Sequence, residues 1–222
     1  AKIKDTLVMG MGHMMIVPQD YFAMGEFGVS MKYQPEENII LDANSKDESG
    51  QDMEGFFVEK EMTVSKCMQV YGHIISRLIR DDGETVSVED LASYISQNFK
   101  TSRSGVTSVT NARTGGTILV REYYDKIYST VYLIEDGKGG VERRFKENAL
   151  DKEAFDIVAD RATDKRSDIY VRKHLMLGSK YVYREILPIT LYPISTSYFE
   201  WAGKPYISYG MVHFSKGQQE AF

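Results

Sequence analysis

A stretch near the amino terminus is rich in side chains that can bind a soft metal ion. Residues 7–25 read LVMGMGHMMIVPQDYFAMG, with five methionines and one histidine. Met9, Met11 and His13 recur at every second residue, so a strand would project all three from one face as soft ligands for Cu(I). Methionine also fills irregular gaps in a core, and the alternation favours a packed strand face over a metal site.

Three other stretches match cofactor or metal motifs only in part. GMGHMM has Met15 where a dinucleotide-binding loop needs its third glycine, and MIVP follows instead of a helix. DGKGG at 136–140 lacks the spacing of a phosphate-binding loop and is typical of a hairpin turn. In DANSKDESGQDM, Asp47 replaces the required glycine of a calcium loop and Met53 replaces its last acid. We therefore predict no cofactor and no metal.

No catalytic residue can be assigned from the pattern. Cys67 lies on the apolar stripe of an expected helix, where a thiol is usually an inert core group. The four histidines, His13, His73, His174 and His213, are far apart in sequence and form no known motif. The sequence leaves open whether these histidines and Cys67 converge in space.

Composition limits the function classes. The hydrophobic and charged fractions, 42% and 27%, are those of an ordinary globular protein, and the net charge of −5 disfavours an electrostatic grip on nucleic acid. The single cysteine cannot form an intrachain disulfide. No apolar run reaches the roughly 20 residues of a membrane span, and no signal peptide pattern is present. We expect a soluble protein, cytoplasmic or part of a particle assembled in the cytoplasm, with no membrane partner.

Basic residues interleaved with tyrosines keep a single-stranded nucleic-acid binder open as an alternative. Acidic neighbours at Glu142, Glu147 and Asp151 favour a mixed solvated face instead. The basic candidates are Lys100, Arg103, Arg113, Arg143, Arg144 and Lys146.

Periodicity indicates several strands and three helices. Apolar residues recur every three or four positions over 63–80, and SVED at 87–90 can cap a second helix that runs to Phe99. A third helix is expected over 151–162. The expected strands are 6–18, 26–33, 38–43, a hairpin of 117–124 and 127–135 turning at Asp125-Lys126, 141–145, 168–177, 180–194 and 205–214. Pro188 and Pro193 make the strand 180–194 an edge strand or break it in two.

This order predicts an α+β fold, an antiparallel β-rich domain with a central pair of amphipathic helices and a third short helix. We expect a single domain over 1–222. An exposed acidic loop near 44–54 and a polar connector near 100–116 interrupt the regular elements.

The middle of the chain is similar to a proteasome-type N-terminal-nucleophile hydrolase. The similarity rests on the order of the helices at 63–80 and 88–99 and of the expected hairpin at 118–137. That family needs an amino-terminal Thr, Ser or Cys, whereas the sequence given begins with Ala1 and has Thr6 nearby. The resemblance implies a hydrolase whose catalytic groups converge only in space.

A non-enzymatic structural or assembly subunit is the function that the sequence favours. The 15 tyrosines and 11 methionines belong to residue types that are enriched in the centres of protein interfaces. Strand edges are natural docking surfaces. We therefore expect a homo- or hetero-oligomer, in its most concrete form a virion or tail component, with the hydrolase and the nucleic-acid binder as alternatives.

Overall fold

The computed structural model describes residues 6, 11–21, 26–79, 117–135, 140–149, 152–178 and 180–198. Its contacts divide the chain into two compact units, one comprising Ala1–Phe57 with Ile189–Phe222 and the other Val58–Pro188. The expectation of a single domain over 1–222 stays a prediction.

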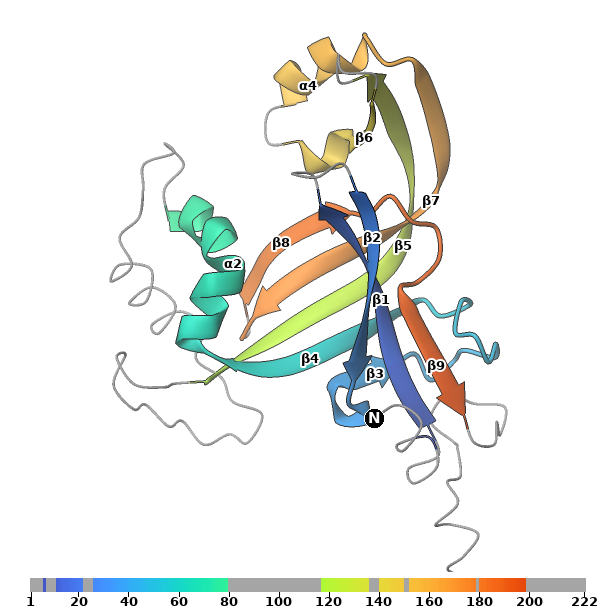
Figure 1. Ribbon diagram of the computed structural model, residues 1–222, viewed down its shortest axis with the longest axis vertical. Coiled ribbons are helices and arrows are strands. Elements are labelled where there is room, and N and C mark those ends of the chain that lie inside the picture. Colours follow the sequence, from blue (N-terminus) through green and yellow to red (C-terminus); the bar gives the residue numbers. More distant parts are fainter. Residues whose placement is uncertain are drawn as a thin grey trace, which may run out of the picture. The chain divides into compact units, whose positions relative to one another are not determined.

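The first unit contains a three-stranded antiparallel sheet in the order β2-β1-β9 (Figure 1). Its strands are β1 (Met11–Tyr21), β2 (Glu26–Gln34) and β9 (Ile194–Tyr198). Met11, His13 and Met15 of β1 are buried, whereas the next residue, Ile16, is exposed. This pattern confirms that β1 has a packed face, to which two buried methionines, Met11 and Met15, contribute.

The acidic segment that follows is organised by its own carboxylates. After the 3₁₀ turn Glu36–Asn38 and strand β3 (Ile39–Leu41), Asp52 accepts backbone hydrogen bonds from Lys46 (2.7 Å) and Asp47 (3.2 Å). Residues 46–49 are exposed, but Ser45 and Met53 are buried. The segment thus contributes to the core of the first unit at two positions where the polar sequence indicated no burial.

The second unit is built on a long antiparallel sheet. In spatial order its strands are β4 (Gly55–Thr63), β5 (Thr117–Glu135), β7 (Asp164–Leu177) and β8 (Lys180–Ile186). β3 pairs with β4, whose first residues belong to the first unit, and β6 (Val141–Phe145) pairs with the far end of β5. In Figure 1, β5 and β7 run side by side along their lengths.

The expected hairpin at Asp125-Lys126 is wrong, because β5 continues through these residues as one strand of 19 residues. Asp125 and Lys126 pair with Arg172 and Val171 in the ladder with β7. Asp-Lys lacks the glycine or asparagine that a tight turn favours, and Asp125 instead accepts two hydrogen bonds from the guanidinium of Arg172. A continuous partner strand and this ion pair keep the backbone extended.

Two helices are described. α2 (Val64–Ile79) buries Val64, Cys67, Tyr71 and Ile75, which confirms the predicted apolar stripe. These residues pack on Ile118, Val120, Leu175, Leu177 and Val182 of the sheet. α4 (Lys152–Ala159) buries Phe155 and Ala159, and the Phe155 ring meets Tyr132 edge-on at 5.2 Å. The mixed architecture with antiparallel sheets confirms the α+β prediction.

Turn and proline positions set the ends of the last strands. Gly178 adopts a φ of 59° between β7 and β8, a conformation that glycine accepts without strain. β8 ends at Ile186 before Pro188, and β9 begins after Pro193. The predicted strand over 180–194 therefore breaks in two. The predicted helix over 87–99, the connector 100–116 and the strand 205–214 lie outside the described residues.

Candidate functional site: a charge network on the large sheet

Glu122 of β5 is the centre of a polar network on the α2 side of the large sheet. It is only 8% exposed, and it lies beside the apolar cluster that holds α2. The Tyr71 hydroxyl donates to Glu122 Oε1 at 2.9 Å, and the Tyr124 hydroxyl donates to Oε2 at 3.4 Å. The carboxylate is thus bound by one residue of the helix and one of its own strand.

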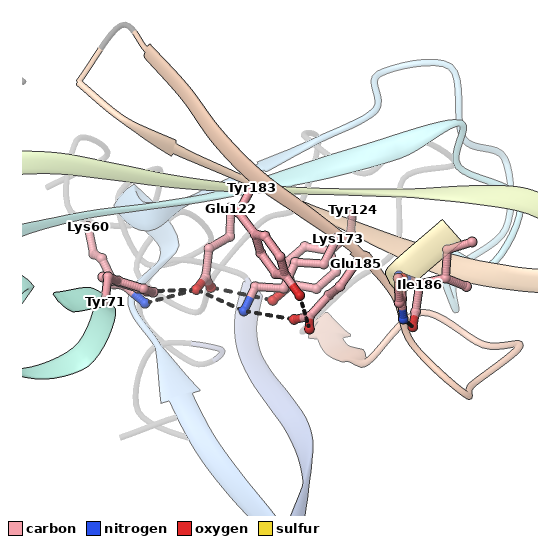
Figure 2. A network of polar contacts seen from close by, with 9 residues as sticks. Lys60, Tyr71, Glu122, Tyr124, Lys173, Tyr183, Glu185 and Ile186 are labelled. Atoms are coloured by element: carbon pink, nitrogen blue, oxygen red, sulfur yellow. Dashed lines mark hydrogen bonds and ion pairs between the residues drawn. The ribbon is translucent and has the colours of Figure 1, made fainter. Parts of the chain in front are cut away.

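Two lysines compensate the charge of Glu122. Lys60 Nζ of β4 lies 3.5 Å from Oε1, and Lys173 Nζ of β7 lies 3.3 Å from the same oxygen. Lys173 Nζ also lies 3.9 Å from Oε1 of Glu185 on β8. The other oxygen of that carboxylate, Oε2, accepts a hydrogen bond from the Tyr183 hydroxyl at 3.5 Å. Figure 2 shows these side chains meeting at Glu122, with the chain of contacts continuing to Glu185.

The electrostatics of this cluster favour the charged carboxylate. Burial alone would raise the pKa of Glu122, but the charges of Lys173 and Lys60 and the hydrogen bond from Tyr71 hold it below its ordinary value. Burial and the neighbouring carboxylate raise the pKa values of both Tyr71 and Tyr124. Near neutral pH Glu122 is therefore a charged carboxylate, and Tyr71 and Tyr124 are neutral phenols.

The opposite face of the sheet carries two further ion pairs. Arg121 Nε of β5 lies 2.6 Å from Glu59 Oε1 of β4. Asp125 accepts from Arg172 Nε at 3.0 Å and from Nη2 at 2.5 Å, a two-point contact that fixes both groups. Successive residues of a strand point to opposite faces, so Arg121 and Glu122 serve different faces.

His174 lies next to the Asp125–Arg172 pair. Its Nε2 is 3.4 Å from Asp125 Oδ1, and its ring packs near those of Tyr123 and Tyr181. Burial lowers the pKa of His174, and the charges of Arg172 and Arg184 add to this effect against the opposing charge of Asp125. Neutral imidazole is therefore the favoured form at pH 7.

The other histidines and Cys67 do not form a described cluster with His174. Cys67 is fully buried in the α2 core, and burial raises its thiol pKa to about 11, as expected of an inert cysteine. His13 belongs to the first unit, where its Nδ1 lies 3.0 Å from Thr196 Oγ1. It is 1% exposed, which is typical of a satisfied core histidine. The His73 side chain and His213 lie outside the described part of the chain.

Two of the three described basic residues that suggested nucleic-acid binding are paired with acids. Arg144 pairs with Glu142 at 2.7 Å, and Lys146 pairs with Asp156 at 2.7 Å. Arg143 is exposed. Lys100, Arg103 and Arg113 lie outside the described residues. A mixed solvated face describes this region better than a positive groove does.

Sequence reasoning missed Glu122 and Asp125 as key residues. A signal was present, because Ile118, Val120, Glu122 and Tyr124 share one face of a strand and put a carboxylate in an apolar row. A buried carboxylate needs paired charges, and the sequence alone does not show which lysines supply them.

Replacing Glu122 with Gln should lower the free energy of unfolding by about 2 kcal/mol, since it leaves Lys60 and Lys173 without their shared counter-ion. The native pKa is depressed, so this stabilisation is complete above the ordinary carboxyl value of 4.5 and is lost as the pH falls through the lower native pKa. Urea unfolding at pH 7 and at several lower pH values measures both effects. Glu135→Gln, at the exposed end of the same strand, is the matched control. Equal effects of the two substitutions would contradict the assignment.

His174→Gln should flatten the pH dependence of stability just below pH 6.5. The unfolded chain protonates this histidine near its ordinary pKa of 6.5, whereas the native state resists protonation, so native stability falls as the pH decreases through that value. Unfolding free energies at pH 7.5, 6.0 and 5.0 test the expectation. An unchanged slope between pH 7.5 and 5.0 in the variant would refute it.

Comparison with known proteins gives the family. The chain matches the family described as phage P22-like portal protein over residues 2–222. A search of the curated proteins found no match. Among the described residues, no helix has both the length and the apolar character that crossing a membrane requires. Because the family match covers nearly the whole sequence, the chain belongs to the phage P22-like portal protein family and is a structural component of a phage particle.

Proposed function

We propose that this chain is an assembly subunit that associates with copies of itself within the phage particle. The single observation that carries the proposal is the family match over residues 2–222. Membership of a portal family implies oligomerisation and protein contacts inside a particle. Most soluble oligomers are symmetric assemblies of one chain, so a second copy is the first partner to test.

The charge network supports a structural role. Glu122 is bound by two lysines and two tyrosines, and Asp125 is bound by an arginine fork. Groups engaged in this way fix the positions of strands and of α2 relative to one another. They thereby stabilise the packing of the second unit.

Exposed apolar pairs supply contact surface. Tyr128 of β5 and Ile169 of β7 stand directly opposite each other and are 71% and 50% exposed. In the first unit, Ile16 and Met31 are likewise opposite each other, and Met31 is 67% exposed. Single exposed apolar residues are common, but cross-strand pairs form larger patches of the kind that protein interfaces cover. We assign these pairs to contacts between copies.

The proposal predicts that the purified protein forms an oligomer in solution, whose mass is a multiple of the 25.3 kDa of one chain. Light scattering coupled to size exclusion, at several micromolar concentrations, measures that mass directly. A mass of 25.3 kDa at every concentration, including after mixing with the other structural proteins of the particle, would contradict self-association and hetero-association together.

Ile169→Lys should weaken self-association at least tenfold, about 1.4 kcal/mol, because it places a charge in the exposed Tyr128–Ile169 pair. The stability of the subunit should change by no more than about 0.5 kcal/mol, since the site is exposed. Ile157→Lys, at an exposed position of α4 outside any strand pair, is the matched control. Wild-type association of the first variant, or an equal loss in the control, would remove this pair from the interface.

A further inference from the structure

The edge of β8 carries a side chain that imitates a neighbouring strand. Asn148, at the end of the 3₁₀ turn Lys146–Asn148, accepts a hydrogen bond from the Ile186 backbone N–H at 2.7 Å. Its amide nitrogen donates to the Ile186 carbonyl at 2.8 Å. One side chain thus satisfies both backbone groups of one strand residue, as a paired strand would.

Register shows that these two groups point away from β7. In an antiparallel ladder, residues alternate between those whose backbone groups bond the partner strand and those whose groups turn outward. Leu187 N–H donates to the Val171 carbonyl at 2.8 Å, so the adjacent Ile186, opposite Arg172, turns outward. Among the described strands of the large sheet, β8 is the last in order on this side. Asn148 therefore occupies a bonding position on the sheet edge.

The Asn148 side chain is held in place from its own segment. Phe145, three residues earlier, packs edge-on against Tyr170 at 4.9 Å and shares a buried cluster with Ile186. Lys146 is tied to Asp156 of α4 through both carboxylate oxygens, at 2.7 and 2.8 Å. The turn is thus anchored on both the sheet and the helix, and the amide is presented in a fixed position.

The rest of the β8 edge shows other features that discourage strand pairing. A register shift lies opposite Leu175 and Met176, and Pro188 follows the strand end without a backbone N–H. Arg184, the outward-turned residue between the register shift and Ile186, is exposed and charged. An open strand edge recruits strands from other chains, and these are the devices that prevent it.

We propose that Asn148 is an assembly-control residue, which blocks the β8 edge against an extended strand of a second copy. The inference rests on the proposed function, because it concerns how a self-associating subunit avoids pairing through the wrong surface. The side-chain amide makes the two hydrogen bonds that an incoming strand would otherwise make with Ile186.

Asn148→Ala is the first test. It removes both hydrogen bonds, so the variant should form species larger than the wild type at equal micromolar concentration, with an infrared band of intermolecular β-structure. Asn148→Asp keeps the acceptor for the Ile186 N–H and loses the donor, so its excess association should be intermediate. Backbone amide exchange at Ile186 should be at least tenfold faster in dilute Asn148→Ala than in dilute wild type.

A second substitution separates edge recruitment from simple destabilisation. Arg184→Pro removes an outward-facing N–H from β8 without removing a bond to β7. The double variant Asn148→Ala/Arg184→Pro should return to the wild-type mass if strands pair at this edge. Circular dichroism checks that each variant is folded. Persistent large species in the folded double variant, or no excess association in Asn148→Ala, would overturn the proposal.

The wild-type mass distinguishes this inference from the proposed function. Self-association of the wild type with no further increase in Asn148→Ala would overturn the edge block and leave the proposed function standing. A monomeric wild type with edge-dependent association of Asn148→Ala would overturn the proposed function and support the edge block.

Discussion

Glu122 is a charged group inside the second unit, and its compensation constrains everything around it. Its carboxylate is compensated only when β4 brings Lys60, β7 brings Lys173 and α2 brings Tyr71 to the same place. A buried charge without its partners costs several kcal/mol, so arrangements that separate any of these elements are strongly disfavoured. Strand order and helix docking are therefore coupled through one side chain, which favours a single cooperative packing of this unit.

The ion pairs on the opposite face also fix the register of β5 relative to its neighbouring strands. Because side chains alternate between faces, a shift of β5 by one residue would move Glu122 away from its lysines and turn it toward the face that holds Glu59. The same shift would separate Asp125 from the guanidinium of Arg172. Apolar residues alone tolerate such slips more readily than two-point hydrogen-bonded pairs do. The two faces together define one alignment of a 19-residue strand.

Periodicity in the sequence was sufficient to predict the elements whose buried face follows from the spacing of neighbouring residues. The stripe of α2, the alternation of Met11, His13 and Met15, and the break near Pro188 were all readable from spacing. The continuity of β5 through Asp125 was not, because it depends on Arg172, which is 47 residues away in sequence. Local turn chemistry competes with distant partners, and here a long partner strand prevailed.

The polar site shows why the rest could not be predicted. A carboxylate in an apolar row signals a buried pair, but Lys60 and Lys173 are two of many lysines, and only the strand order selects them. The Asn148 contact is harder still, since it joins a side chain to the backbone of Ile186 in a strand 38 residues away. Such contacts determine which parts of the subunit surface stay accessible to a partner. When internal charges are compensated and a sheet edge is occupied, exposed apolar pairs such as Tyr128–Ile169 become the surfaces with most to gain from a partner.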